Sequence, residues 1–246
     1  MTDTSHKPLI AAIIPAYNEE HSIGYVVMNL LEVAKTHQFN LDVIVVNDSS
    51  TDNTSQIAAK LDCILINLPS NLGIGGAVQT GFKYAFLKGY DFAMQVDGDG
   101  QHPPKEISKI ILPALANEAD VMIGSRFLEK SGFQSTFLRR LGINYFKHII
   151  KVFCGIRVSD CTSGFRIINS KALEIVNSYY PDEYPEPESV IQFHQNNLTI
   201  KEVQVEMNER EGGKSSIRAF NTLYYMIKVT IAILFTYIRL KKHKIK

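Results

Sequence analysis

The sequence is poor in cysteine and in net charge. It has three cysteines among 246 residues, an odd number, and no pair has the spacing of a metal site. We therefore expect no disulfide framework, and a reducing cytosol fits this composition. Because the formal net charge is only +1, bulk charge does not direct the chain to nucleic acid, and we expect no nucleic-acid partner.

Export and linker signals are also missing. Residues 1–8 are polar and lack the apolar core of an export signal, so we expect a short N-terminal tail there. No Gly/Ser/Pro-rich linker and no internal repeat follows. The length, with hydrophobic residues at 45%, suffices for one large domain with a buried core. We expect that domain over residues 9–216 and a separate apolar helix with a basic tail over residues 217–246.

Short apolar runs alternate with amphipathic stretches. The expected strands are residues 9–14, 41–46, 63–67, 92–96, 121–123, 165–168 and 199–205. The expected helices are residues 20–37, 73–87, 137–153 and 187–196. This alternation is typical of an α/β fold with a mostly parallel sheet flanked by helices. In such sheets ligands bind at the carboxyl ends of the strands, which is where the polar clusters of this sequence fall.

A loop of carboxylates and glycines follows the fourth expected strand. It reads Asp97-Gly98-Asp99-Gly100-Gln101. Two carboxylates separated by one glycine can both face one cation, and with the Gln101 oxygen they form an all-oxygen ligand set suited to Mg²⁺ or Mn²⁺. The alternative is a solvated turn, since Asp and Gly are common in turns.

Three more clusters end expected strands. Residues 71–77 place glycines at a helix start, where backbone N–H groups favour anions; close helix packing would need the same glycines. In Pro15-Ala16-Tyr17-Asn18-Glu19, the tyrosine can pack against a nucleobase. Asp48 can accept hydrogen bonds from a base or ribose, or it can cap the next helix.

The C-terminal segment carries few charges. Across residues 223–240 only Lys228 and Arg239 are charged, and on a helix they share one narrow stripe with Asn221. The segment is marginal for a membrane span. Its wide apolar face and the lysines from Lys241 onward suit a helix lying on an anionic membrane surface. A helix buried against the domain or a second subunit would have the same composition, so both interpretations stay open.

In this order, the motifs resemble glycosyltransferase family 2, and within it the dolichyl- or polyprenyl-phosphate sugar synthases. The resemblance extends from about residue 9 to residue 216. It implies a nucleotide-sugar-binding GT-A-like fold, a catalytic domain over residues 9–216, and a Mg²⁺ or Mn²⁺ cofactor held by Asp97, Asp99 and Gln101. The donor-binding residues that it implies are Pro15, Tyr17, Glu19, Asp48, Gly73 and Asp97. The sequence departs from the family pattern at residues 47–50, where an acidic pair followed by glycine is usual.

The carboxyl half carries the rest of the resemblance. Arg126 resembles an arginine that faces the acceptor phosphate, and either Arg139 or Arg140 resembles a second phosphate-binding position. Residues 160–166 resemble a motif near the reacting centre, although Asp160 can also be a turn residue with Arg166 as its structural partner. Residues 210–215 resemble a loop that closes over the diphosphate. The implied acceptor-phosphate set is Arg126, Arg139, Arg140 and Ser215.

One acidic position is ambiguous. Glu188 lies 14 residues before Glu202, where the family carries an acidic residue, but the sequence reads Pro185-Glu186-Pro187-Glu188. Either glutamate can therefore take the role, or both can only complement a helix dipole. The implied catalytic set is Asp99, Asp160, Glu188 and Arg210.

The resemblance implies displacement with inversion at the anomeric carbon of a nucleotide sugar, with Arg210 stabilising the leaving diphosphate. A polyprenyl phosphate acceptor needs no base because it is already anionic, whereas a glycan hydroxyl would need Glu188 or Asp160 as base. A nucleotide-binding module and an NAD-dependent oxidoreductase, suggested by the glycines at 73–76, are alternatives. We expect the protein at the cytoplasmic face of a membrane, and a homo-oligomer is compatible with the sequence.

Overall fold

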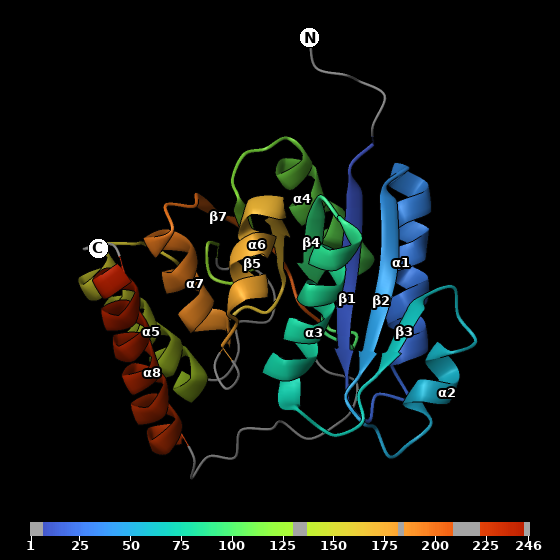
Figure 1. Cartoon of the computed structure of the whole chain (residues 1–246), viewed down its shortest axis with the longest axis horizontal. Helices are drawn as coiled ribbons and strands as arrows, with labels where there is room; N and C mark the ends of the chain where they lie inside the picture. The colour runs from blue at the N-terminus through green and yellow to red at the C-terminus, as the bar shows by residue number, and fades with distance from the viewer. Residues whose placement is uncertain (1–6, 130–136, 182–184, 209–221, 244–246) are drawn as a thin grey trace.

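The expected α/β class is observed in the computed structural model (Figure 1). The structure describes residues 7–129, 137–181, 185–208 and 222–243. The strands are β1 (Leu9–Ala16), β2 (Asn40–Asn47), β3 (Ile64–Asn67), β4 (Phe92–Gln95), β5 (Val121–Ser125), β6 (Arg166–Asn169) and β7 (Ile200–Gln204). The helices are α1 (Ile23–His37), α2 (Thr54–Ala58), α3 (Gly73–Lys88), α4 (Pro104–Leu115), α5 (Phe137–Cys154), α6 (Ser170–Ser178), α7 (Pro185–Gln195) and α8 (Thr222–His243).

Within these ranges the strands form one 7-stranded sheet in the order β3-β2-β1-β4-β6-β5-β7. Strands β1 to β4 pair in parallel, and so do β5 and β7. Strand β6 runs antiparallel to both neighbours, β4 and β5. The predicted mostly parallel sheet is confirmed, with one reversed strand that the sequence pattern does not reveal. Because β6 begins where its neighbours end, the segment before it, residues 160–165, lies at the carboxyl edge of the sheet.

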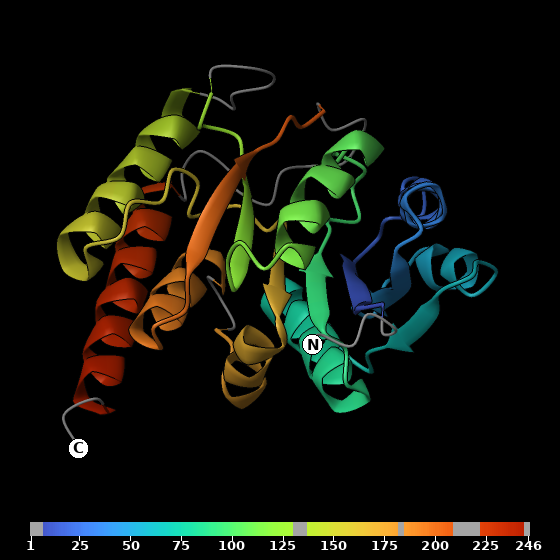
Figure 2. The same ribbon diagram turned by 90° about the horizontal axis from the view of Figure 1, so that it is seen from above.

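Helices cover both faces of the sheet (Figures 1 and 2). Alternate residues of β1 divide the core: Ile10 and Ile14 belong to the cluster under α1, α2 and α4, and Ile13 belongs to the cluster under α3, α6 and α7. Helices α5 and α8 lie side by side at the β7 end of the molecule. The period-two alternation of a buried strand therefore gives the sheet two apolar faces.

Two boundaries differ from expectation because of proline. Pro15 was expected to end the first strand, but β1 continues to Ala16. Strand β4 pairs with β1 only as far as Ile13, so Pro15 lies beyond that pairing, where a missing N–H removes no bond on that side. Helix α4 was not predicted; it carries prolines at its start and at Pro113, which from sequence indicate breaks. Helix α6, also not predicted, begins directly after β6, where Asn169 accepts a hydrogen bond from the Ala172 N–H at 3.1 Å.

The helix expected over residues 223–240 is confirmed as α8. None of the helices in the described ranges combines the length and the apolar composition that a membrane span requires. Val229 and Ile233 of α8 are fully buried in the core. One side of the same helix exposes the large apolar side chains of Ile227, Ile231, Phe235 and Ile238. The helix therefore docks on the domain and also leaves an apolar row in solvent.

Helix α3 approaches β1 so closely that only glycine fits at one position. A Cβ on Gly81 would lie 2.3 Å from Cγ2 of the buried Ile13. We expect Gly81→Ala to lower the free energy of unfolding by about 1–3 kcal/mol through overpacking. The matched control is Gly142→Ala in α5, where a Cβ meets no atom within 4 Å; alanine should raise helix stability there by about 0.5–1 kcal/mol. Urea unfolding of both variants measures the two effects, and equal stabilities would contradict the close approach.

Candidate functional site

The carboxyl ends of β1, β2, β4 and β5 meet at one edge of the sheet, and the polar clusters of the sequence gather there. Strand β4 ends at Gln95, and Asp97 follows two residues later in the loop after it. A Cβ on Gly98 would lie 3.2 Å from the carbonyl oxygen of Pro15, so this loop rests against the end of β1. Gly100 has φ +76°, a conformation that favours glycine. The two glycines thus bring the carboxylates of Asp97 and Asp99 to the edge of the sheet without steric conflict.

These carboxylates suit a hard divalent cation. The side chain of Gln101 donates to the carbonyl oxygen of Asn208 at 3.1 Å, and its backbone N–H donates to Asp99 at 3.1 Å, which ties the loop to the segment after β7. No group of three or more His, Cys, Asp or Glu side chains converges in the described residues. Two carboxylates, with further oxygens from a substrate phosphate, are an ordinary Mg²⁺ environment, so the residues present fit this ion.

Hydrogen bonds connect the loops after β1 and β2. The Glu19 N–H donates to Thr54 Oγ1 at 2.8 Å, the Asn18 N–H donates to Ser50 Oγ at 3.0 Å, and the Thr51 N–H donates to Asn18 Oδ1 at 2.8 Å. Tyr17, between them, is 48% exposed. The structure therefore holds the backbone at this edge firmly and leaves one aromatic ring in solvent, as a base-stacking group would require.

Asp48 is buried and spans the start of α3. Its two carboxylate oxygens accept the N–H groups of Leu72 at 2.7 Å and Gly73 at 2.9 Å. The sequence left open a cap on the next helix, α2, but Asp48 instead binds the start of α3, 25 residues away in the chain. A carboxylate has about four lone-pair sites, so these bonds leave acceptor capacity for a donor nucleoside.

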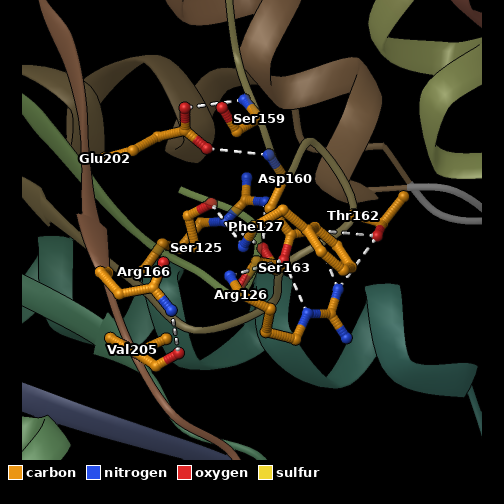
Figure 3. A network of polar contacts seen from close by, with 11 residues as sticks. Ser125, Arg126, Phe127, Ser159, Asp160, Thr162, Ser163, Arg166, Glu202 and Val205 are labelled. Atoms are coloured by element: carbon orange, nitrogen blue, oxygen red, sulfur yellow. Dashed lines mark hydrogen bonds and ion pairs between the residues drawn. The ribbon is translucent and has the colours of Figure 1, made fainter. Parts of the chain in front are cut away.

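Arg126 and Asp160 form a buried ion pair beside this edge (Figure 3). Arg126 Nε donates to Asp160 Oδ2 at 2.6 Å, Arg126 Nη2 donates to Oδ1 at 2.8 Å, and the side chains are 9% and 0% exposed. Burial opposes the guanidinium charge, but the bonds to Asp160 outweigh it, so the pKa of Arg126 is raised. Asp160 is therefore the partner of Arg126, and the alternative pairing with Arg166 is not observed.

Glu202 of β7 holds the backbone beneath this pair. Its carboxylate accepts the N–H groups of Ser159 at 2.7 Å and Asp160 at 2.8 Å (Figure 3). Thr162 adds an acceptor for Arg126 Nη2 at 3.2 Å. Three segments far apart in the chain thus fix one guanidinium. The sequence gives no signal for this role of Glu202, because it depends on β7 pairing with β5.

Arg166, 1% exposed, makes different contacts. Its guanidinium donates to the carbonyl oxygen of Ser163, to Ser189 Oγ of α7 at 2.7 Å, and to the carbonyl oxygen of Glu186 at 3.4 Å. It therefore joins strand β6 to the first turn of α7. In the same region, a Cβ on Gly164 would lie 2.5 Å from Gln95 Nε2 and 3.2 Å from Asp97 Oδ1, so the backbone there approaches both side chains closely.

The remaining expected site residues are dispersed or lie outside the described structure. Glu188 is buried and accepts a hydrogen bond from Thr236 of α8 at 2.7 Å. Arg140 is exposed on α5. Arg210 and Ser215 lie outside the described residues, and so does the side chain of Arg139.

His102, the residue after Gln101, is buried. Its ring stacks on Phe165, with centroids 4.3 Å apart. Neither ring nitrogen has a hydrogen-bond partner within the described part of the chain. Burial lowers the pKa of His102, against the opposing charges of Asp97 and Asp99. The imidazole is therefore packed beneath the loop that carries Asp97 and Asp99.

Comparisons with known proteins identify relatives of this chain. The family model described as "Glycosyl transferase family 2" matches residues 11–176. A UDP-N-acetylglucosamine–dolichyl-phosphate N-acetylglucosaminyltransferase of Methanococcus voltae is 33% identical, over 80% of this chain and 84% of the relative. A polyprenol monophosphomannose synthase of Mycolicibacterium smegmatis is 27% identical, over 88% and 84%.

Solved structures share the fold. Glucosyl-3-phosphoglycerate synthase from Mycobacterium tuberculosis, in complex with Mn²⁺, UDP-glucose and phosphoglyceric acid, superposes with a TM-score of 0.71 at 17% identity, covering 94% of this chain and 80% of that one. Mannosyl-3-phosphoglycerate synthase from Rubrobacter xylanophilus gives 0.68 at 14% identity, covering 97% and 76%. At these identities the likeness establishes the fold alone, and the expected GT-A-like class is confirmed.

The buried ion pair gives a stability prediction. Asp160→Ala leaves the Arg126 guanidinium buried without its counter-charge, so we expect a loss of about 3–5 kcal/mol in the free energy of unfolding. The double variant Arg126→Met/Asp160→Leu should lose less, because no unpaired charge remains. The control is Lys201→Ala, whose 3.3 Å pair with Glu118 is exposed and should contribute no more than about 1 kcal/mol. Denaturant unfolding decides, and a loss for Asp160→Ala no larger than for the control would contradict the prediction.

Proposed function

Because the chain belongs to glycosyl transferase family 2, we propose that it transfers a sugar from a nucleotide-sugar donor to a polyprenyl phosphate, with inversion at the anomeric carbon. The observation that carries the proposal is the Asp97-Gly98-Asp99 loop at the carboxyl edge of the sheet, beside the buried Arg126–Asp160 pair. The resemblance to the dolichyl- and polyprenyl-phosphate sugar synthases is confirmed by the named relatives.

On the donor side, the nucleoside lies over the ends of β1 and β2. Tyr17 packs against the base, and Asp48 accepts hydrogen bonds through the lone pairs that Leu72 and Gly73 leave. Pro15, Glu19 and Gly73 shape the backbone around the nucleotide. Asp97, Asp99 and Gln101 hold Mg²⁺ or Mn²⁺, which when bound neutralises the charge that grows on the leaving diphosphate.

On the acceptor side, a polyprenyl phosphate is already anionic at neutral pH, since its second pKa is about 6. It therefore attacks the anomeric carbon without a protein base, and arginines have only to position it. Arg126 places a positive charge at this edge, with Asp160 fixing its orientation. Ser215 and either Arg139 or Arg140 complete the proposed contacts with the acceptor phosphate, and Arg210 stabilises the leaving diphosphate.

A sugar hydroxyl acceptor, as in polysaccharide assembly, is the second candidate. It requires a carboxylate that removes a proton in the transition state. Asp160 is poorly suited, because it is fully buried and bonded twice to Arg126. Glu188 is committed to Thr236. Both predicted bases are therefore already engaged in hydrogen bonds, which supports the phosphate-acceptor proposal.

Helices α5 and α8 support a location at a membrane surface. Both carry exposed apolar side chains, among them Tyr145, Val152 and Phe235. Neither residues 137–157 nor residues 212–246 contain Asp or Glu, whereas both stretches contain lysine and arginine. An apolar and cationic surface of this kind binds anionic headgroups, and each lysine near the surface adds about 1 kcal/mol. We place this surface on the cytoplasmic face, where a lipid acceptor presents its phosphate; contact with a second copy of the chain is the alternative.

The transfer itself is tested with membranes, a panel of radiolabelled nucleotide sugars and extraction of the lipid phase. We expect label in lipid only with Mg²⁺ or Mn²⁺ present. Asp97→Ala and Asp99→Ala should each remove most of the turnover and leave the fold intact, since these loop positions bury little apolar area. The control is Asp62→Ala, an exposed carboxylate before β3. Full activity in excess chelator would rule out the metal, and nucleotide binding without any transfer or donor hydrolysis would indicate a binding module.

Membrane attachment is tested by substitution, because deleting α8 would uncover the core around Val229 and Ile233. We expect Ile231→Ser/Phe235→Ser to weaken sedimentation with anionic vesicles by at least about tenfold, since each large apolar side chain contributes about 1.5–3 kcal/mol when buried. The control is Leu87→Ser on α3, where the side chain is 78% exposed. High salt should also release part of the wild-type protein. Unchanged sedimentation of the double variant, with a change in oligomeric state, would assign the row to a subunit interface.

A further inference from the structure

The first turn of helix α7 contains two glutamates whose side chains point to opposite sides of the helix. Glu186 and Glu188 both belong to the first turn. Successive residues of an α-helix turn by about 100°, so residues two apart point about 200° from each other. Helix α7 is packed between the sheet and α8, with residues such as Ile191 and Phe193 fully or almost fully buried. One glutamate must therefore face the sheet and the other must face α8.

Glu188 faces α8. Its Oε2 accepts a hydrogen bond from Thr236 Oγ1 at 2.7 Å, and the two residues are 7% and 4% exposed. The bond lies one turn beyond Ile233, which anchors α8 in the core. A buried carboxylate that loses such a partner is costly, so this bond strongly favours one position of α7 against α8.

Glu186 shares the other side of α7 with Ser189, three residues later. Arg166 identifies that side as the one facing the sheet, because its Nη1 donates to Ser189 Oγ at 2.7 Å and to the Glu186 carbonyl at 3.4 Å. Arg166 lies opposite Gln95 in the β4–β6 pairing. Two residues beyond Gln95 comes Asp97. The first turn of α7 is therefore linked through Arg166 of β6 to β4, the strand that precedes Asp97 and Asp99.

The charges around Glu186 are those of the proposed site. Burial raises the pKa of the carboxyl, Arg166 opposes the rise, and the charges of Asp97 and Arg126 also act on it. Glu186 is thus within electrostatic reach of both the donor side and the acceptor side. Glu188, through Thr236, is committed to α8.

We propose that Glu186 orients the transferred sugar by accepting a hydrogen bond from one of its hydroxyl groups, and that Glu188 positions Glu186 by tying α7 to α8 through Thr236. The inference rests on the proposed function and assigns to Glu186 the acidic role that the sequence left between the two glutamates. No proton is transferred and no covalent bond forms. The carboxylate selects an orientation of the sugar, and the α7–α8 contact determines where that carboxylate lies.

The first experiment separates sugar from nucleotide. Glu186→Gln and Glu186→Ala should lower kcat/KM for the nucleotide sugar by at least about tenfold, because a hydrogen bond to a charged acceptor is lost or weakened. Affinity for UDP or GDP alone, measured by calorimetry with whichever binds the wild type, should change by less than about twofold. The control is Glu174→Gln, an exposed glutamate on α6. Wild-type kcat/KM in Glu186→Gln, or an equal loss of nucleotide affinity, would overturn the assignment.

The second experiment tests whether Thr236 acts through Glu186. Thr236→Val removes the hydroxyl with little change of shape and should lower kcat/KM by about tenfold, whereas Thr236→Ser should keep it. In the Glu186→Gln background, Thr236→Val should have no further effect, because the residue that it positions is already lost. If the two substitutions instead lower kcat/KM by the product of their separate effects, Thr236 does not act through Glu186 and the positioning role is overturned. The control is Thr230→Val, whose hydroxyl bonds the Met226 carbonyl of its own helix at 2.6 Å and Tyr145 Oη of α5 at 3.2 Å rather than a residue of α7. Where the Thr236 variant fails to fold, Glu188→Gln takes its place.

The inference and the proposed function fail in different ways. Absence of transfer by the wild type to polyprenyl phosphate would reject the function. In that case the wild type and the Glu186 variants would be compared by their rates of donor hydrolysis, in which water replaces the acceptor. Wild-type transfer together with unaltered Glu186 variants would reject the inference alone.

Discussion

Arg126 and Asp160 form an ion pair away from solvent at the end of β5, and the geometry of the neighbouring loops depends on that contact. Removing both charges from water costs several kcal/mol each, and only a close two-point contact with further hydrogen bonds offsets the cost. The structure supplies those bonds through Thr162 and through Glu202, which holds the backbone of Ser159 and Asp160. The pair is therefore stable only when β5, β7 and the segment before β6 are all in place.

The reversed strand β6 makes this arrangement possible. A parallel strand at that position would begin at the opposite edge of the sheet. The segment before it would then lie far from the loop that carries Asp97 and Asp99. Because β6 is antiparallel to β4 and β5, residues 160–165 approach Asp97 and Arg126 from the carboxyl edge. The residues after β1, β2 and β4 thus follow the ordinary rule for parallel sheets, and residues 160–165 reach the same edge only because β6 is reversed.

Helix α7 connects this site to the outer surface. Arg166 binds its first turn from the sheet, and Thr236 binds Glu188 from α8. Helix α8 buries Val229 and Ile233 inward and exposes Ile231 and Phe235 outward. If α8 contacts a lipid surface as proposed, the helix at that surface also supports the helix that carries Glu186.

The sequence by itself determined the class of fold, most of the strands and helices, and the gathering of Asp97, Asp99 and Asp48 at strand ends. Those features depend on local periodicity and on short motifs, which are present in neighbouring residues. Only the tertiary structure decided that Asp160 pairs with Arg126 rather than Arg166, that Asp48 caps α3, and that Glu186 and Glu188 face opposite neighbours. Each of these contacts depends on which strands and helices are neighbours in the fold. The hydrophobic pattern of the sequence does not specify those neighbours, as the reversed direction of β6 shows.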